Sequence, residues 1–375
     1  MIEIAPLRTR ADRRAFVELP GQLLVGDPNW IEPLHLDRLE LIDPVKNPFF
    51  EHAEAEFWLA RRDGRPVGRV SAQIDRLSPN HDGTPVGSFG QIALEDDAEL
   101  AATLFATAEA WLRERGVGVV RGPFDLSINE ECGLLVDGFD TPPFMLMPHN
   151  ARCLPGLVEG AGYAPVRDLL AYRMDVTAEL PPAASRLIDR PLGDVTLRPL
   201  RIREFDAELR RVCAIFNDAW VDNFGFIPLT DAEMAAMAKK LRPIIDPELV
   251  RIAEIEGRPV AFIVLLPNIN EALATMNGRL LPLGWAQLAW MVLGRRIRTG
   301  RVPLMGVLRE TQATALGAIL PAAMIAALSP RARARRMTTI EMGWILEENT
   351  AVRRIIERMG GQEAKRLRLY EKRLA

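Results

Sequence analysis

An internal repeat constrains the fold of this 375-residue chain more than any other feature of its sequence. Four segments return in the same order at nearly the same spacing. They are APLRTR (5–10) with RPLRIR (198–203), DPNWIEPL (27–34) with DNFGFIPL (222–229), ARRDGRPVGRV (60–70) with AEIEGRPVAFI (253–263), and LVEGAGY (157–163) with IIERMGG (355–361). Order and spacing together indicate a duplication, so we predict two domains, 1–180 and 194–375. The proline-containing stretch 179–194 is the expected linker.

Each copy predicts the same coarse order of a strand, a helical region, a hairpin, and then strands alternating with helices. The predicted hairpins lie at 57–73 and 251–266, where apolar and polar residues alternate around an Asp-Gly or Glu-Gly turn pair. Apolar residues at helical spacing predict a helix over 97–115 that ends before Gly116. Strands with interleaved helices favour the α/β (α+β) layered class.

Composition and charge indicate a globular protein of a reducing compartment. Hydrophobic residues make up 48% of the chain, and the net charge of −3 argues against nucleic acid as the main partner. The three cysteines are far apart and odd in number, and the N-terminus lacks the apolar stretch of a secretory signal. We therefore predict a cytoplasmic protein. The four histidines lack metal-ligand spacing, so no metal site is predicted.

Two C-terminal stretches, LMGVLRETQATALGAIL (304–320) and TTIEMGWILEENTAVRRIIERMGG (338–361), resemble the acyl-CoA core of the GNAT acyltransferase family. The resemblance implies that a loop of the form Q/R-x-x-G-x-G/A binds the pyrophosphate of CoA with backbone N–H groups at a helix N-terminus, where the helix dipole favours an anion. It likewise implies that a backbone N–H of the preceding strand holds the acyl carbonyl and that an asparagine binds the pantetheine arm. The matching residues are Gln312, Ala313, Thr314, Ala315, Leu316 and Gly317 for the loop, Val307 and Leu308 for the strand, and Asn349 for the arm.

The middle glycine of that loop is replaced by Ala315, which still permits close backbone approach when its φ is negative. The corresponding segment of the first copy is acidic around Asp97 and would repel a pyrophosphate. We therefore expect acyl-CoA in the second copy, with the first copy as a degenerate domain that binds the acceptor or stabilises the second.

Over nearly its full length the chain resembles a group of bacterial GNAT-like N-acyltransferases that includes the bacterial ceramide synthases. The resemblance rests on stretches such as NPFFEHAEAEFWLARRDGRPVGRV (47–70) and GPFDLSINEECGLLVDGFD (122–140). It implies transfer of a long-chain acyl group from acyl-CoA to an amine, most specifically a sphingoid base. Aminoacyl transfer from a tRNA and non-catalytic binding of acyl-CoA or lipid are the alternatives.

Acyl transfer to an amine needs a base, because a protonated amine cannot attack a thioester. Glu310 follows the strand before the loop, and Glu341 lies on the next strand, facing away from Ile340, Met342 and Trp344. His149 is a third candidate base. A solvated loop carboxylate, a strand salt bridge and a structural histidine are the respective alternatives. Candidate acceptor contacts, with ordinary loop structure as the alternative, are Asn129, Glu130 and Asn150.

The stretch 280–301 combines apolar residues at helical spacing with four arginines at its end, Arg295, Arg296, Arg298 and Arg301. This pattern is typical of a helix at a membrane interface, and a buried helix with basic ends is the alternative. The stretch is shorter than the ~20 apolar residues that cross a bilayer. We expect peripheral contact with the inner membrane, and Trp285 as a contact of a lipid amine or long acyl chain.

Overall fold

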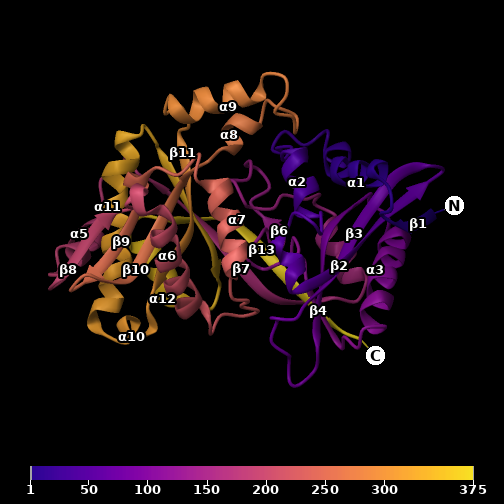
Figure 1. The fold of residues 1–375 in the computed structure, drawn as a ribbon, viewed down its shortest axis with the longest axis horizontal. Helices are drawn as coiled ribbons and strands as arrows, with labels where there is room; N and C mark the ends of the chain where they lie inside the picture. The colour runs from indigo at the N-terminus through magenta and orange to yellow at the C-terminus, as the bar shows by residue number, and fades with distance from the viewer. Residues whose placement is uncertain (1, 375) are drawn as a thin grey trace.

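The computed structural model describes residues 2–374, which form one continuous mixed sheet with helices on both faces (Figure 1). The first half contains β1 (Ile2–Pro6), α1 (Arg10–Leu23), α2 (His35–Leu41), β2 (Ala53–Arg62), β3 (Arg65–Asp75), β4 (Val86–Leu94), α3 (Ala98–Arg113), β5 (Val119–Gly122), β6 (Leu134–Asp137), α4 (Leu154–Gly160) and β7 (Ala164–Asp175). Helix α5 (Pro182–Ile188) follows. The second half contains β8 (Val195–Pro199), α6 (Phe205–Trp220), α7 (Asp231–Leu241), β9 (Val250–Ile255), β10 (Arg258–Pro267), α8 (Asn270–Leu273), α9 (Gly284–Leu293), β11 (Thr299–Val307), α10 (Arg309–Gln312), α11 (Ala315–Ala334), β12 (Thr339–Leu346), α12 (Thr350–Arg358) and β13 (Gln362–Arg373).

The second half repeats the element order of the first, which confirms the duplication predicted from the sequence. The four repeated segments fall on equivalent places: the end of β1 and of β8, the approach to α2 and to α7, the hairpins β2–β3 and β9–β10, and the ends of α4 and α12. Both hairpin turns use left-handed backbone, with φ of 52° and 80° at Asp63 and Gly64 and of 50° and 80° at Glu256 and Gly257. The predicted pair of GNAT-like units in an α/β (α+β) fold is therefore present.

The last strands of the two halves are exchanged at the centre of the sheet. The strand order is β1-β2-β3-β4-β5-β13-β7-β12-β11-β10-β9-β8, so β13 of the second half lies between β5 and β7 of the first. β7 in turn pairs with β12, with Met174 opposite Ile340. All three of these pairings are antiparallel. Each half thus completes the sheet of the other, which the sequence repeat alone did not indicate.

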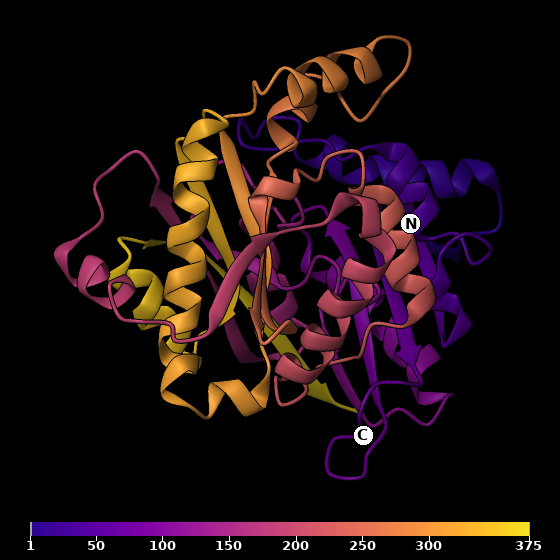
Figure 2. The same ribbon diagram turned by 60° about the vertical axis from the view of Figure 1, so that its left-hand side comes forward.

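Two layers of helices cover the sheet (Figures 1 and 2). On one face α3 packs on Val70 and Phe89, and α11 packs on Ile340 and Met342. On the other face α6 packs on Phe262, while the seam between the halves is covered by residues that follow β5. Each fully buried leucine in these layers contributes about 2 kcal/mol relative to an exposed one.

Two segments differ from the sequence-based expectation. The expected linker 179–194 contains helix α5, whose Ala184 is fully buried in the same cluster as α11. Trp344 lies in the cluster on the face opposite Ile340 and Met342, so its expected side was wrong. Within residues 2–374, α11 is the one helix long and apolar enough to cross a membrane, and half of it is buried in the fold.

The strand exchange predicts that neither of the two predicted domains, 1–180 and 194–375, folds alone. These bounds are a prediction of the sequence, and residues 1 and 375 lie outside the described structure. Expressed separately, each fragment exposes a central strand edge and should aggregate or remain partly unfolded. Co-expressed, the fragments should form a 1:1 complex that unfolds in one transition, measured by circular dichroism and light scattering. A monomeric 1–180 fragment with its own cooperative unfolding transition would contradict this expectation.

Candidate active site

The second half contains an open fork between two parallel strands. β11 and β12 pair from Thr299 opposite Thr339 to Val302 opposite Met342, and beyond that point no pairing joins them. The N–H of Leu308 donates to the carbonyl of Val260 on β10 at 2.8 Å, so Leu308 is not free to hold an acyl carbonyl. Because successive N–H groups of a strand point to opposite edges, the N–H of Val307 faces the fork.

Two side chains donate hydrogen bonds to carbonyl groups on the open edge of β11. The carbonyl of Met305 accepts from the indole of Trp220 at 3.2 Å, and that of Val307 accepts from the amide of Gln312 at 2.6 Å. With its carbonyl oxygens satisfied in this way, the edge offers N–H donors to a ligand. The resemblance assigned Gln312 to the pyrophosphate. In the structure its side chain stabilises the end of β11.

Helix α11 begins at the end of this fork with an uncapped N-terminus. Thr314 is the N-cap residue, but its hydroxyl donates to the carbonyl of Thr311 and makes no side-chain cap. The N–H groups of Ala315 and Leu316 have no carbonyl four residues earlier within the helix, and α11 has no acidic residue in its first turn. This end of the helix therefore offers donors and a favourable dipole to an anion.

The other N–H groups of the predicted loop are hydrogen-bonded within the loop and the turn before it. The N–H groups of Gln312, Ala313 and Thr314 donate to carbonyls of Leu308, Arg309 and Thr311 in the turn that includes α10, and the N–H of Gly317 donates to Thr314. A Cβ atom added at Gly317 would lie 2.5 Å from the Cα of Gln312. Gly317 is therefore needed for the close packing of α11 on α10, and a substitution there would change packing as well as charge.

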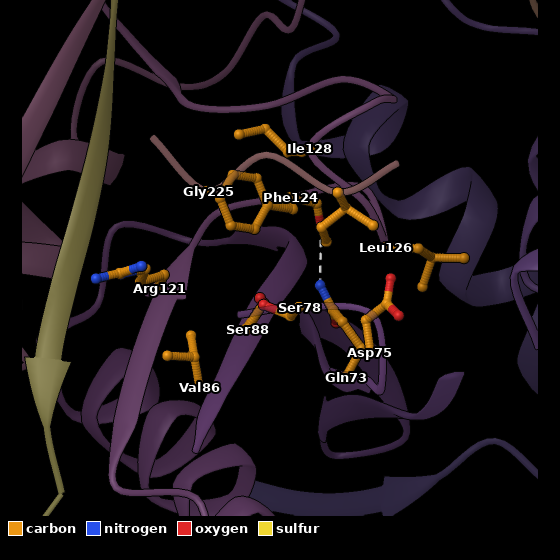
Figure 3. Close-up of a pocket in the computed structure, with 11 residues that line it drawn as sticks. Gln73, Asp75, Ser78, Val86, Ser88, Arg121, Phe124, Leu126, Ile128 and Gly225 are labelled. Carbon is orange, nitrogen blue, oxygen red and sulfur yellow. Dashed lines mark hydrogen bonds between the residues drawn. The ribbon is translucent and has the colours of Figure 1, made fainter. Parts of the chain in front are cut away.

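The first half has closed its equivalent fork. β4 and β5 pair only from Val86 to Ser88, and beyond this the chain itself fills the gap, because the N–H of Phe124 donates to Phe89 at 2.9 Å. The amide of Gln73 donates to the carbonyl of Phe124 at 3.1 Å (Figure 3). The cavity beside it measures about 20 Å³, which is room for about one water molecule.

The N-terminus of α3 is closed as well. Asp97 caps this helix and accepts hydrogen bonds from the N–H groups of Glu99 and Leu100. These N–H groups, first of all that of Leu100, lower the pKa of Asp97, with Arg62 contributing. A carboxylate thus occupies the place that an external phosphate would need, as the acidic sequence predicted.

Residues 138–145 form a strap across the seam, on the face opposite α11. Its backbone is held by side chains from both halves, several of them on strands. The ammonium of Lys365 on β13 donates to Gly138 and Thr141, Arg173 on β7 donates to Pro142, and Arg301 on β11 donates to Met145. Asn268 accepts from the N–H of Met145 at 2.9 Å. The strap therefore covers the point where β11 and β12 begin to separate.

A buried group of charges lies beneath the strap. Glu341 is 0% exposed, accepts from Arg173 at 3.1 Å through one oxygen and has no partner for the other. Burial raises the pKa of Glu341, and the charges of Arg173 and Arg301 oppose that shift. Lys365 is 1% exposed, and burial lowers its pKa to about 8. One carboxylate therefore faces three cations.

His149 reaches the same region from the first half. Its Nε2 lies 2.8 Å from a carboxylate oxygen of Asp27, and its Nδ1 is buried without a partner. Burial lowers the pKa of His149, although Asp27 opposes the shift, so burial favours the neutral form of the ring. The charge of Lys365 acts on His149, and the charges of Glu341 and Asp27 both act on Lys365. Lys365 thus interacts electrostatically with both His149 and Glu341.

Glu310, the third candidate base, lies elsewhere. Its side chain is 58% exposed and forms an ion pair with Arg258 at 2.8 Å. Five strand residues at about 3.3 Å each separate Val302, the last paired residue of β11, from Val307. Val307 is thus about 16 Å from the start of the fork, and Glu310 follows it beyond the end of the strand, at the outer mouth.

The remaining candidates differ in what their side chains already bind. Asn349 caps α12 through its carbonyl oxygen, which leaves its amide group as a donor. Asn150 is buried and bonds both backbone groups of Leu135, and Asn129 donates to the carbonyl of Ile227. Glu130 is exposed near Lys240, and Trp285 is 58% exposed on α9. Of these residues the last two are the most exposed, and the indole N–H of Trp285 donates to the carbonyl of Pro282 at 3.1 Å.

Sequence analysis did not single out Arg173, Lys365 or the strap. In the sequence these two cations look like solvated members of alternating strands, since each strand end carries several charges. Arg301 was assigned to a membrane-facing group, and this was wrong, because it is 3% exposed within β11. Within residues 2–374 no group of three or more His, Cys, Asp or Glu side chains is placed to hold a metal.

No family model matches the chain. A curated protein, Bacterial ceramide synthase from Caulobacter vibrioides (strain NA1000 / CB15N), is 45% identical over 375 residues, covering 100% of this chain and 98% of the relative. This chain belongs to the same family of GNAT-type N-acyltransferases. Protein YghO from Escherichia coli (strain K12) is 43% identical over 97% of this chain and 93% of its own length.

Solved structures of this N-acyltransferase family's fold agree with the duplicated architecture. The tandem GNAT protein from the clavulanic acid biosynthesis pathway has a TM-score of 0.59 at 13% identity, covering 100% of this chain and 98% of that one. The GCN5-related N-acetyltransferase from Sphaerobacter thermophilus has a TM-score of 0.52 at 16% identity, covering 99% and 95%. The enzyme class predicted from the sequence is therefore confirmed.

The buried charges of the N-acyltransferase predict how one substitution changes stability, and a second substitution at an exposed carboxylate serves as its control. Glu341→Gln leaves Arg173 and Arg301 buried without a compensating carboxylate, which should lower the free energy of unfolding by about 3 kcal/mol. Glu310→Gln removes an exposed partner of Arg258 and should change it by less than about 0.5 kcal/mol. Urea denaturation of both variants measures the difference. Equal stabilities would show that Glu341 does not compensate the buried cations.

Proposed function

We propose that this enzyme transfers a long-chain acyl group from the thioester of acyl-CoA to an amine, most specifically a sphingoid base. The observation that carries the CoA assignment is the contrast between the halves. The second half combines an open fork with an uncapped helix N-terminus, whereas the first half has filled its fork with Phe124 and capped its helix with Asp97. The name of the curated relative supports a sphingoid acceptor.

In this proposal the pyrophosphate lies at the N–H groups of Ala315 and Leu316. The pantetheine arm enters the fork, where the free amide of Asn349 can donate to it. On the open edge of β11 the N–H of Val307 donates to the arm, and the N–H of Met305, which lies nearer the strap, donates to the acyl carbonyl and polarises it for attack. Acyl-CoA is a cytoplasmic metabolite, and we accordingly propose a cytoplasmic location.

The amine approaches from the face that carries the strap. Its nitrogen attacks the thioester carbon, the carbon–sulfur bond breaks, and CoA leaves as the thiolate. We assign the removal of the amine proton to Nδ1 of His149, because this nitrogen is neutral, unpartnered and oriented by Asp27. Glu341, which accepts from Arg173, offsets part of the positive charge of Arg173, Arg301 and Lys365 beneath the strap. Glu310 at the outer mouth takes no part in the proton transfer.

The CoA assignment is tested by giving α11 the cap that α3 already has. Thr314→Asp places a carboxylate at the N-cap, which should preserve or raise the melting temperature while weakening acyl-CoA binding roughly tenfold or more. Thr314→Asn is the matched neutral control and should bind as the native enzyme does. Calorimetric titration with acyl-CoA measures both. Equal affinities for the Asp and Asn variants would place the pyrophosphate elsewhere.

The proton assignment is tested with His149→Gln, which keeps a donor for Asp27 but has no basic nitrogen. Turnover of a long-chain amine should fall by about 10²–10⁴-fold with little change in acyl-CoA affinity, and the deficit should shrink at high pH, where more amine is neutral. His52→Gln is the matched control, since His52 also lies 2.8 Å from a carboxylate, that of Asp75. Near-normal turnover of His149→Gln at neutral pH removes this residue from the mechanism.

A further inference from the structure

Helix α9 and the turn before it carry a group of large apolar side chains that no other part of residues 2–374 covers. None of the residues of α9 is buried. The exposed fractions are 77% for Leu281, 73% for Leu283, 58% for Trp285, 57% for Trp290 and 80% for Leu293. Exposed apolar residues are ordinary when scattered, but a contiguous group of this kind marks an interaction surface.

The charged residues along this stretch of the chain are of one sign. No acidic residue occurs between Glu271 and Glu310, and Arg279, Arg295 and Arg296 are all exposed in that interval. The guanidinium of Arg296 stacks over the ring of Trp290 at 3.8 Å, so one cation lies directly beside the apolar side chains. Apolar residues with tryptophans and arginines at their border match the headgroup region of an anionic bilayer.

The surface stands on a platform formed by both halves. Leu288 and Met291 of α9 pack on a cluster that joins Leu273 of α8 to Leu34, just before α2. Helix α9 therefore projects beyond the sheet above both halves, at the end of β11 opposite α10 (Figure 1).

The platform also connects to the strap. Asn270 at the start of α8 donates to the carbonyl of Pro143 at 3.0 Å, and Asn268 just before it accepts from Met145. From the other end of α9 the chain runs directly into β11, whose Arg301 holds the strap as well. A surface bound by α9 thus lies next to the face through which the amine approaches.

We propose that the exposed residues of 279–296, centred on α9, dock the enzyme on an anionic lipid bilayer. The tryptophans and leucines enter the headgroup region, and the arginines contact lipid phosphates. The fit of a basic rim to an anionic surface selects a membrane over a second copy of this chain, because two such rims would repel one another. This inference is independent of the acyl transfer proposed above.

The test is sedimentation of the full-length protein with vesicles, without acyl-CoA or amine, so that catalysis does not enter the measurement. The protein should bind vesicles that contain phosphatidylglycerol and bind pure phosphatidylcholine vesicles far more weakly. Trp285→Ser with Trp290→Ser should weaken binding at least roughly tenfold. Arg295→Gln with Arg296→Gln should weaken binding to anionic vesicles roughly 30-fold and make it less sensitive to salt.

Ile202→Ser with Val221→Ser is the matched control, because these side chains are 44% and 43% exposed and lie outside α9. This variant should bind vesicles as the native protein does. The proposal is overturned if the native protein does not bind anionic vesicles, or if the tryptophan pair changes only its oligomeric state in sedimentation velocity. Loss of vesicle binding with unchanged turnover of a short, soluble amine separates this surface from the catalytic site.

Discussion

The exchange of β7 and β13 is the constraint on which the rest of the molecule depends. These two strands carry Arg173 and Lys365, which donate hydrogen bonds to the backbone of the strap. Without the exchange the two halves would be separate sheets, and no residue of one would lie under a strap of the other. The central antiparallel pairing therefore determines where a substrate that contacts both halves can bind.

The two halves show that one fold can either bind a cofactor or serve as structural support alone. Their strands follow the same order, yet small local choices decide whether the fork between two parallel strands stays open. In the first half the chain at Phe124 fills the fork, and the carboxylate of Asp97 accepts from the helix N–H groups that a phosphate would otherwise bind. In the second half Trp220 and Gln312 satisfy carbonyls only, so that the donors remain. Specific binding thus depends on which polar groups a protein leaves unsatisfied.

The repeat, the hairpins and the GNAT-like core could be predicted because each depends on residues that are close together in the sequence, such as the Asp63-Gly64 turn. The strand exchange could not, since β7 and β13 alternate in a way that fits either half equally well. Of the candidate site residues, His149 and Glu341 stay predictions, whereas Glu310 is exposed at the outer mouth and the side chain of Asn150 is already bonded to Leu135. Lys365 was missed because burial of a lysine depends on long-range packing that a strand pattern does not record.

The exchange also sets the order in which the protein can be completed on the ribosome. The first half needs β13, which ends at Arg373, before its central strand edges are covered. Roughly 200 residues separate the end of β7 from that point, so synthesis leaves these edges unpaired for about 10 to 40 s. Edges of this kind pair readily with other chains, and a nascent chain therefore relies on shielding until its last dozen residues emerge.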